Sequence, residues 1–241
     1  MNGTTELVFI LDRSGSMYGL ESDTIGGFNA VLEKQKKAEG KVLLSTVLFN
    51  QETAILHDRR DIREIPALTA EDYSVSGCTA LYDAVGGAIR HIRNVHRYIR
   101  PEDVPEHTLF VITTDGLENA SSRFSAGEVR KMIEEQKEKG WEFLFLGANI
   151  DAESTARDFG LSEKNAADFI CDGAGIRTMY ESLSHVCSCF ARTGVIEGDW
   201  KSRIREDYER RGGKDGRRFG RKDSFSLRDV LRTMRGGSFI L

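Results

Sequence analysis

Residues 7–16 of the chain read LVFILDRSGS, five apolar residues followed directly by an acid and a short Ser/Gly loop. A continuous apolar run of this length, rich in β-branched residues, predicts a strand that is buried on both faces. Such strands belong to parallel sheets covered by helices, and these sheets bind ligands at the carboxyl ends of their strands. The polar residues at 12–16 are therefore the first candidates for function.

The same order of apolar strand, loop and amphipathic helix repeats along the chain. Further strands are predicted at residues 41–49, 53–56, 108–114, 142–146 and 167–170, and helices at residues 22–39, 80–97, 125–139, 152–159 and 174–192. The short connection between the second and third strands predicts a hairpin, so the third strand is an antiparallel edge strand. The predicted fold class is α/β: a doubly wound, mostly parallel central sheet of about six strands with helices on both faces.

The pattern fails after residue 193, where the charge also changes sign. Residues 1–193 contain 21 Lys and Arg against 30 Asp and Glu, a net charge of −9, whereas residues 194–241 contain 13 against 8, a net charge of +5. The interpretation is one domain at 1–193 and a basic, Gly/Arg-rich C-terminal tail at 194–241, partly disordered, with a short helix at about 226–234. Arg/Gly-rich stretches can bind phosphate backbones, which keeps nucleic-acid association as an alternative. Only Phe219 and Phe225 interleave as aromatics and acids dilute the charge, so nucleic acid is the less favoured partner.

Cysteine usage and the ends of the chain indicate the compartment. The four cysteines form no CxxC pair and no zinc-type spacing with the five histidines, which favours reduced thiols. The first six residues lack a positive segment, and no apolar run approaches the ~20 residues of a membrane span. The expectation is a soluble cytoplasmic protein.

Three polar loops are predicted to meet at one edge of the sheet. Asp12, Ser14 and Ser16 follow the first strand, Thr79 precedes the helix at 80–97, and Asp115 follows the strand at 108–114. Together they supply two carboxylates and three hydroxyls, all hard oxygen ligands of the kind that Mg²⁺ or Mn²⁺ prefers. The sequence therefore predicts a divalent-metal site at this edge.

These residues also carry a family resemblance. The DxSxS segment at 12–16, the threonine of SGCTAL at 76–81 and the TDG at 114–116 resemble the three segments of the metal-ion-dependent adhesion site (MIDAS) of von Willebrand factor A (vWA) domains. The resemblance covers about residues 5–193 and is closest to stand-alone intracellular prokaryotic or phage-type members with an intact site. It implies a Rossmann-like vWA fold in which Ser14, Ser16 and Thr79 ligate the metal through hydroxyls, and Asp12 and Asp115 act directly or through water. It also implies an open coordination position for a Glu or Asp of a partner protein.

Several neighbours of this set have two interpretations. Asp83 either orders the threonine loop or is a first-turn acid favoured by the helix dipole. Glu118 and Asn119 either touch a ligand at the rim of the site or are solvated loop residues. Arg13 either helps to hold an incoming carboxylate or is exposed, and Gly116 belongs to the rim.

The predicted metal site and the family resemblance together lead us to expect a metal-dependent protein-binding module without enzyme activity. A Mg²⁺-dependent phosphotransferase of the haloacid dehalogenase type is the main alternative, but it needs a second aspartate where this chain has Ser14. No glycine-rich nucleotide loop follows a strand, which also disfavours an enzyme. A third alternative is a structural domain whose metal site only stabilises the fold.

Overall fold

The computed structural model describes residues 3–212, and the predicted helix at 226–234 lies outside them. One six-stranded sheet has the order β3-β2-β1-β4-β5-β6 and is parallel throughout, except that β3 is antiparallel to β2. The strands are β1 (Thr4–Asp12), β2 (Lys41–Phe49), β3 (Thr53–Asp61), β4 (His107–Thr114), β5 (Trp141–Ala148) and β6 (Ala166–Phe169). The predicted fold class, including the antiparallel edge strand, is confirmed.

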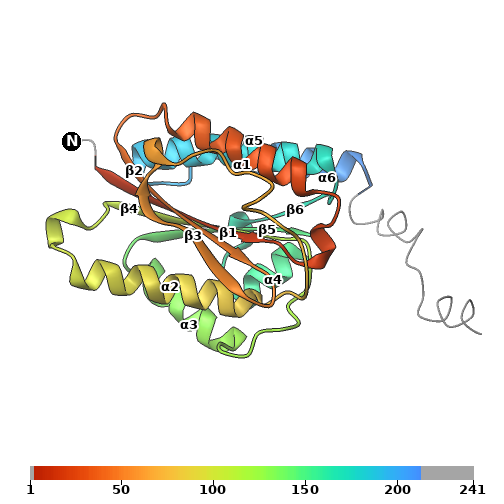
Figure 1. Ribbon diagram of the computed structural model, residues 1–241, viewed down its shortest axis with the longest axis horizontal. Coiled ribbons are helices and arrows are strands. Elements are labelled where there is room, and N and C mark those ends of the chain that lie inside the picture. Colours follow the sequence, from red (N-terminus) through yellow and green to blue (C-terminus); the bar gives the residue numbers. More distant parts are fainter. Residues whose placement is uncertain (1–2, 213–241) are drawn as a thin grey trace, which may run out of the picture.

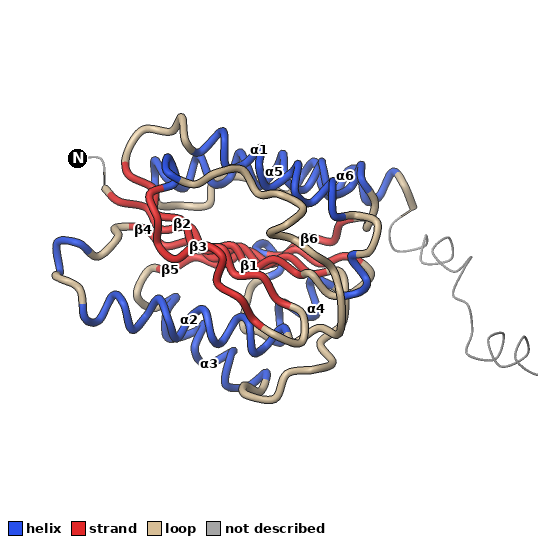
Figure 2. Tube along the Cα trace, in the orientation of Figure 1, coloured by secondary structure: helices blue, strands red, loops and turns tan. Residues whose placement is uncertain are grey.

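Helices cover both faces of this sheet, which is the middle of three layers (Figures 1 and 2). On one face lie α1 (Glu21–Gln35), α5 (Gly173–Thr193) and α6 (Ser202–Arg210); on the other lie α2 (Leu81–Tyr98), α3 (Ala126–Lys137) and α4 (Ala152–Asp158). Short 3₁₀ turns occupy Gly15–Met17, Ile62–Glu64, Pro101–Asp103 and Glu163–Asn165. Within the described chain, no helix has both the length and the apolar character needed to cross a membrane.

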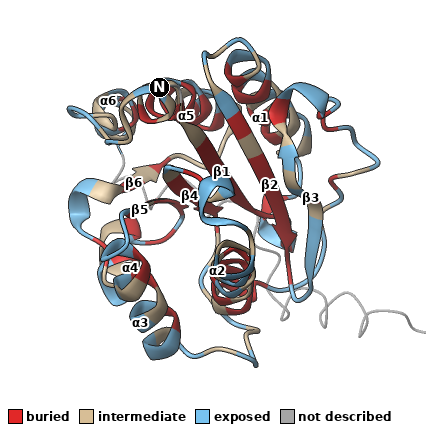
Figure 3. Ribbon diagram, turned by 90° about the vertical axis from the view of Figure 1, so that its left-hand side faces the viewer, coloured by how far each residue is buried: buried red, intermediate tan, exposed pale blue. Residues whose placement is uncertain are grey.

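The central strand β1 is buried on both faces, as its composition predicts. Leu7 and Phe9 pack in the cluster that contains α1 and α5, whereas Val8 and Ile10 pack in the cluster that contains α2 and α3. Figure 3 shows the buried residues on the inner strands and on the helix faces turned toward the sheet. The two-sided burial fixes the strand register, because a slip by one residue would exchange the two faces.

The register of the strands places the candidate loops together at the carboxyl ends of the strands. Asp12 at the end of β1 pairs with Phe49 of β2, and Leu11 pairs with Thr113 of β4. Because these strands are parallel, the residues that follow β1 and β4 emerge side by side at the carboxyl edge of the sheet. The loop before α2 reaches the same edge through Asn50, whose carbonyl accepts the Ala80 N–H at 2.8 Å.

Two segments differ most from the sequence-based expectation. Strand β3 continues to Asp61 beyond the predicted end at residue 56, because an edge strand tolerates charged side chains that face solvent. Helix α6 was not predicted, since its nine residues carry dense charge of both signs. It nevertheless docks through Ile204, which is 1% exposed and part of the cluster beneath α5. The division of the chain at residue 193 stays a prediction.

Candidate functional site

The DxSxS loop is tied to both of its neighbours by main-chain hydrogen bonds. The Arg13 N–H donates to the Phe49 carbonyl at 2.7 Å, and the Arg13 carbonyl accepts the Ser76 N–H at 2.9 Å. The Gly15 N–H donates to the Gly77 carbonyl, also at 2.9 Å. These bonds hold the serine loop against the loop that carries Thr79.

The predicted site residues of the first and third segments form one connected network. The Ser14 N–H donates to Asp12 Oδ1 at 2.7 Å, and the hydroxyls of Ser14 and Ser16 lie 3.1 Å apart. Ser16 in turn donates to Asp115 Oδ1 at 2.6 Å. The other Asp12 oxygen accepts the Thr114 hydroxyl at 2.6 Å. Four of the five predicted ligands therefore belong to a single chain of contacts.

Gly116 shows where the fifth residue, Thr79, lies. A Cβ added at Gly116 would lie 3.3 Å from the Ser16 hydroxyl and 3.3 Å from the Thr79 hydroxyl, so both face this residue. Asn119 fixes Thr79 from outside: its side-chain oxygen accepts the Thr79 N–H at 2.9 Å, and its own N–H donates to the Thr79 carbonyl at 3.0 Å. The structure thus brings all five predicted residues to one place, with Gly116 between two of them.

The exposure of the five residues shows from which side solvent reaches the network. Asp12, Ser14, Thr79 and Asp115 are 1–3% exposed, whereas Ser16 is exposed. Solvent therefore meets the network at Ser16, and the two acids lie beneath it.

Both acids lie in surroundings that disfavour the negatively charged carboxylate. Burial raises the pKa of Asp12 against the hydrogen bonds that it accepts, and burial together with the charge of Asp12 raises the pKa of Asp115 to about 6. Within residues 3–212, no Lys or Arg forms an ion pair with either carboxylate. Two buried acids with three hydroxyls fit a divalent cation, which would supply the missing positive charge and accept hard oxygen ligands.

A cluster of three or more His, Cys, Asp and Glu side chains suited to a metal is absent from the described residues. The set at this edge has a different composition, since three of its five members are hydroxyls. Its chemistry therefore rests on oxygen donors rather than on the sulfur and imidazole ligands of zinc sites.

Two of the neighbours with two interpretations, Asp83 and Glu118, bind main-chain N–H groups of the described chain. Asp83 lies in the first turn of α2, and its carboxylate accepts the N–H groups of Ser122, Arg123 and Phe124 at 2.9–3.0 Å. Burial would raise its pKa, but these three bonds lower it overall. Asp83 thus orders the segment after Asp115 rather than the threonine loop.

Glu118 turns inward instead of into solvent. Its carboxylate accepts the N–H groups of Ala120, Ser121 and Tyr82 at 2.7–3.0 Å and so closes the loop around itself. Arg13 is only partly exposed, and its Nε is buried without a hydrogen-bond partner among the described residues. Its suggested role in holding a carboxylate stays a prediction.

Three further residues support the site and were not among the predicted site residues. The hydroxyl of Tyr73, a 1% exposed residue, donates to the carbonyl of Asp12. Thr114 binds Asp12 as described above, and Cys171 Sγ lies 3.6 Å from Asp115 Oδ2, with its pKa raised to about 12 by burial and by that carboxylate. Thr114 was visible as the first residue of TDG, but Tyr73 lies in a segment that reads as a polar loop, and nothing in the sequence marks Cys171.

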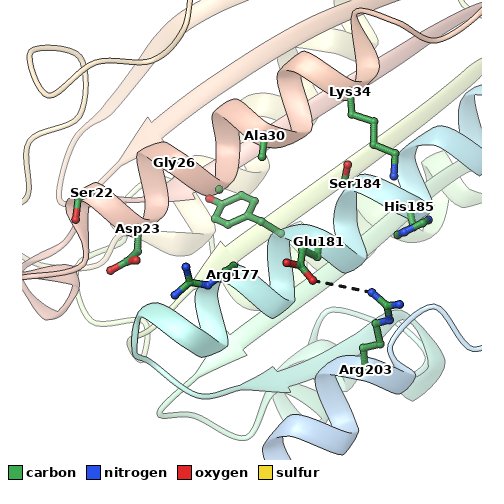
Figure 4. Close-up of a pocket in the computed structure, with 12 residues that line it drawn as sticks. Ser22, Asp23, Gly26, Ala30, Lys34, Arg177, Glu181, Ser184, His185 and Arg203 are labelled. Carbon is green, nitrogen blue, oxygen red and sulfur yellow. Dashed lines mark ion pairs between the residues drawn. The ribbon is translucent and has the colours of Figure 1, made fainter.

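A separate groove of about 560 Å³ runs along the seam between α1 and α5 (Figure 4). Small residues of α1 allow this close approach: a Cβ on Gly27 would lie 2.1 Å from the Tyr180 ring. Charged side chains of both signs line the walls, including Glu181 and Arg203, whose nearest charged atoms are 3.9 Å apart. The groove is not part of the acid and hydroxyl network.

Comparison with solved structures decides the type of fold. The vWF domain of the type V pili tip protein Mfa5 from Porphyromonas gingivalis matches with a TM-score of 0.59 and 11% identity, over 82% of this chain and 99% of that one. The chain has the vWA fold. Another vWA match is a von Willebrand factor type A protein from Catenulispora acidiphila, with a TM-score of 0.51 and 14% identity over 77% of this chain and 43% of that one.

Proximal thread matrix protein 1 from the mussel byssus matches this vWA fold with a TM-score of 0.54 and 14% identity, over 77% of this chain and 46% of the mussel chain. The present chain thus spans less than half of that protein. One structure of the mussel protein has its MIDAS motif occupied by zinc. No protein-family model and no curated protein sequence matches the chain.

Proposed function

We propose that the chain is a metal-dependent protein-binding module that captures an acidic residue of a partner protein at a MIDAS. The observation that carries the proposal is the pair of buried acids, Asp12 and Asp115, which have no Lys or Arg partner within residues 3–212 and are joined by serine hydroxyls at the carboxyl edge of a vWA sheet. Buried negative charge of this kind is costly unless a cation neutralises it.

Ser14, Ser16 and Thr79 would hold the metal through their hydroxyls, with Asp12 and Asp115 acting directly or through water. The proposed ion is Mg²⁺ or Mn²⁺, because both accept an all-oxygen set. When bound, it would supply a Lewis-acid centre that attracts an anionic oxygen. The protein's own part is to keep the hydroxyls in place, through the Gly15–Gly77 and Thr79–Asn119 bonds, and to expose the Ser16 side to a partner.

We propose further that the partner contributes a Glu or Asp carboxylate, that the module works in the cytoplasm, and that it is not an enzyme. Ser14 stands where a phosphotransferase of the haloacid dehalogenase type needs its second aspartate. The histidine–hydroxyl contact of the core, His57 Nδ1 to Thr46 Oγ1 at 3.1 Å, joins two buried residues and so offers a substrate no access.

The test is calorimetric titration of metal-free protein with Mg²⁺, Mn²⁺ and Zn²⁺, with acetate or a Glu-containing peptide added in a second series. Wild type should bind one ion saturably, and the carboxylate should tighten that binding. Asp115→Ala should abolish it, whereas the control Asp158→Ala, an exposed acid at the end of α4, should bind as wild type does.

Metal binding that survives Asp115→Ala would overturn the site. Metal binding that no carboxylate tightens would leave a structural ion and remove the capture mechanism. Zinc binding in preference to both Mg²⁺ and Mn²⁺ would correct the choice of ion.

A further inference from the structure

A cavity of about 680 Å³ lies at the opposite end of the sheet from the acid and hydroxyl network. It opens where β4 and β5 begin, beside the C-terminal turns of α2 and α3, at the end where β1 starts in Figure 1. A cavity of this size is in the range that accommodates small-molecule ligands. The proposed function uses none of its residues.

The charge of this cavity is opposite to that of the domain around it. Arg93, Arg97 and Lys139 line it, and Glu106 is the only acid among its described lining residues. Residues 1–193 as a whole carry a net charge of −9. A cationic hollow on an acidic domain raises the local concentration of anions.

These cations are only loosely engaged by the protein. Arg93 Nη1 lies 3.7 Å from the Glu135 carboxylate, and Lys139 Nζ lies 3.5 Å from Gln136 Oε1. Arg97 forms no ion pair with a carboxylate of the described chain and instead lies over the Tyr98 ring at 5.6 Å. Basic residues at helix C-termini also offset the helix dipole, so charge alone does not indicate a ligand.

Gln136 supplies the independent observation. This residue lines the cavity and is 1% exposed, yet its Nε2 has no hydrogen-bond partner within residues 3–212. A buried donor left unpaired destabilises the folded protein, because it has lost its hydrogen bonds to water and gained none in return. An acceptor atom of a bound ligand would remove this cost, and the Lys139 contact does not prevent it because that contact involves Gln136 Oε1.

The remaining wall is rigid and aromatic. Trp141 is stacked on Phe110 at 5.3 Å between ring centroids, and the His96 ring meets it edge-on at the same distance. His96 Nε2 is already bound to the buried carboxylate of Glu6, so this nitrogen is not free to bind an anion and the His96 ring is held against Glu6. The cations that can respond to a ligand are therefore Arg93, Arg97 and Lys139.

We propose that this cavity binds a small molecule that carries a phosphate group. Three cations around one hollow match a multiply charged anion, and guanidinium groups bind phosphate oxygens in a two-pronged geometry. Gln136 donates to an oxygen of the same ligand, and Trp141 lines the wall beside it.

The experiment uses the fluorescence of Trp141 in full-length protein with Trp200→Phe, which removes the second tryptophan of the chain. The probes are inorganic phosphate, AMP and citrate, each titrated at constant ionic strength with a chelator present, so that the result is independent of the metal site. Phosphate or AMP should change the signal saturably. Arg97→Gln and Lys139→Gln should each weaken this binding about tenfold, the loss expected for one charge-assisted hydrogen bond.

Lys131→Gln is the matched control, because it removes the same charge from an exposed position of α3 outside the cavity. It should leave binding unchanged. Gln136→Leu separates a ligand-binding role from a structural one: the ligand-free protein should melt at a higher temperature, since an unpaired buried donor is gone, while phosphate binding weakens.

No saturable signal from either phosphate probe overturns the proposal. So does an equal loss of binding in Lys131→Gln, which would indicate general electrostatics, and so does unchanged binding in Gln136→Leu. Saturation by citrate alone would replace the phosphate group by a carboxylate and overturn the assignment of the ligand class.

Discussion

Buried carboxylates at the two ends of the sheet are treated in opposite ways. Glu6, near the start of β1, is fully buried and pairs with Arg59 Nε at 2.7 Å and with His96 Nε2. Asp12 and Asp115, at the other end, are 2% and 1% exposed, and within residues 3–212 they receive only hydroxyl, thiol and N–H donors. The difference teaches that residues of the chain itself pair with the buried acid at the first end, whereas no Lys or Arg within residues 3–212 pairs with the two acids at the second.

The largest expected effect tests the end of the sheet at which Glu6 is paired with Arg59. Glu6→Ala should lower the free energy of unfolding by about 3–5 kcal/mol, because it leaves the mostly buried Arg59 guanidinium without its partner. Denaturant unfolding measures this loss, and Glu6→Gln should lose less because it retains an acceptor. The loss should be the same with and without Mg²⁺; rescue by Mg²⁺ would break the comparison between the two ends.

The next effect tests the end that carries Asp12 and Asp115, through the pH dependence of the free energy of unfolding. In metal-free protein Asp115 keeps its proton up to a pKa of about 6, whereas the unfolded chain releases it near 4. The unfolded state therefore ionises first, and the free energy of unfolding should fall between about pH 4 and 6 by roughly 3 kcal/mol. Asp115→Asn should remove most of this fall in thermal melts, and saturating Mg²⁺ should reverse it in wild type. A flat profile in wild type would mean that Asp115 is not destabilised by burial.

A smaller effect tests the contacts that hold the loop after Asp115, one of the loops that carry the proposed metal ligands. Asp83→Ala removes the acceptor of three N–H groups and should cost about 2 kcal/mol. Because the segment 122–124 follows Asp115 along the chain, metal affinity should also drop about tenfold, as it does when residues behind metal ligands are changed. Calorimetry and unfolding on one sample measure both. Loss of stability with full metal affinity would limit Asp83 to a structural role.

The smallest effect concerns the only histidine on β3. Burial, with a contribution from Arg60, lowers the pKa of His57, so the folded protein favours the neutral ring. Its contribution to stability should be present above about pH 6.5 and be lost as the pH falls below that value. His57→Asn should flatten this part of the stability profile. The slope should be unaffected by metal, unlike the slope that Asp115 produces.

Much of the fold was predictable because its central strands are continuous apolar runs with helical periodicity between them. β1 illustrates this: burial on both faces leaves no polar residue between Leu7 and Leu11. The end of β3 was not predictable, since Asp58–Asp61 are charged and only the structure shows that Arg59 turns inward to Glu6. Helix α6 escaped prediction because Ile204 is its only buried apolar residue and charged residues surround it in the sequence.

The candidate site was predictable where short polar side chains stand at fixed spacing directly after strands. The set Asp12, Ser14 and Ser16 has this form, and the structure places the three together. The residues behind the set were not predictable, because their roles depend on contacts between distant segments. Tyr73 reaches Asp12 across 61 residues and Cys171 reaches Asp115 across 56, distances at which one sequence alone carries no signal.

The edges of the sheet limit how this protein can assemble with others. At one edge, β3 has two register irregularities, a left-handed Arg59 with φ 47° and charged residues to its end, features that keep a foreign strand from pairing. At the other edge, β6 has only four residues and packs beside α6. Both edge strands of the sheet therefore oppose aggregation by sheet extension, so that association with another molecule falls to side chains and loops rather than to main-chain pairing.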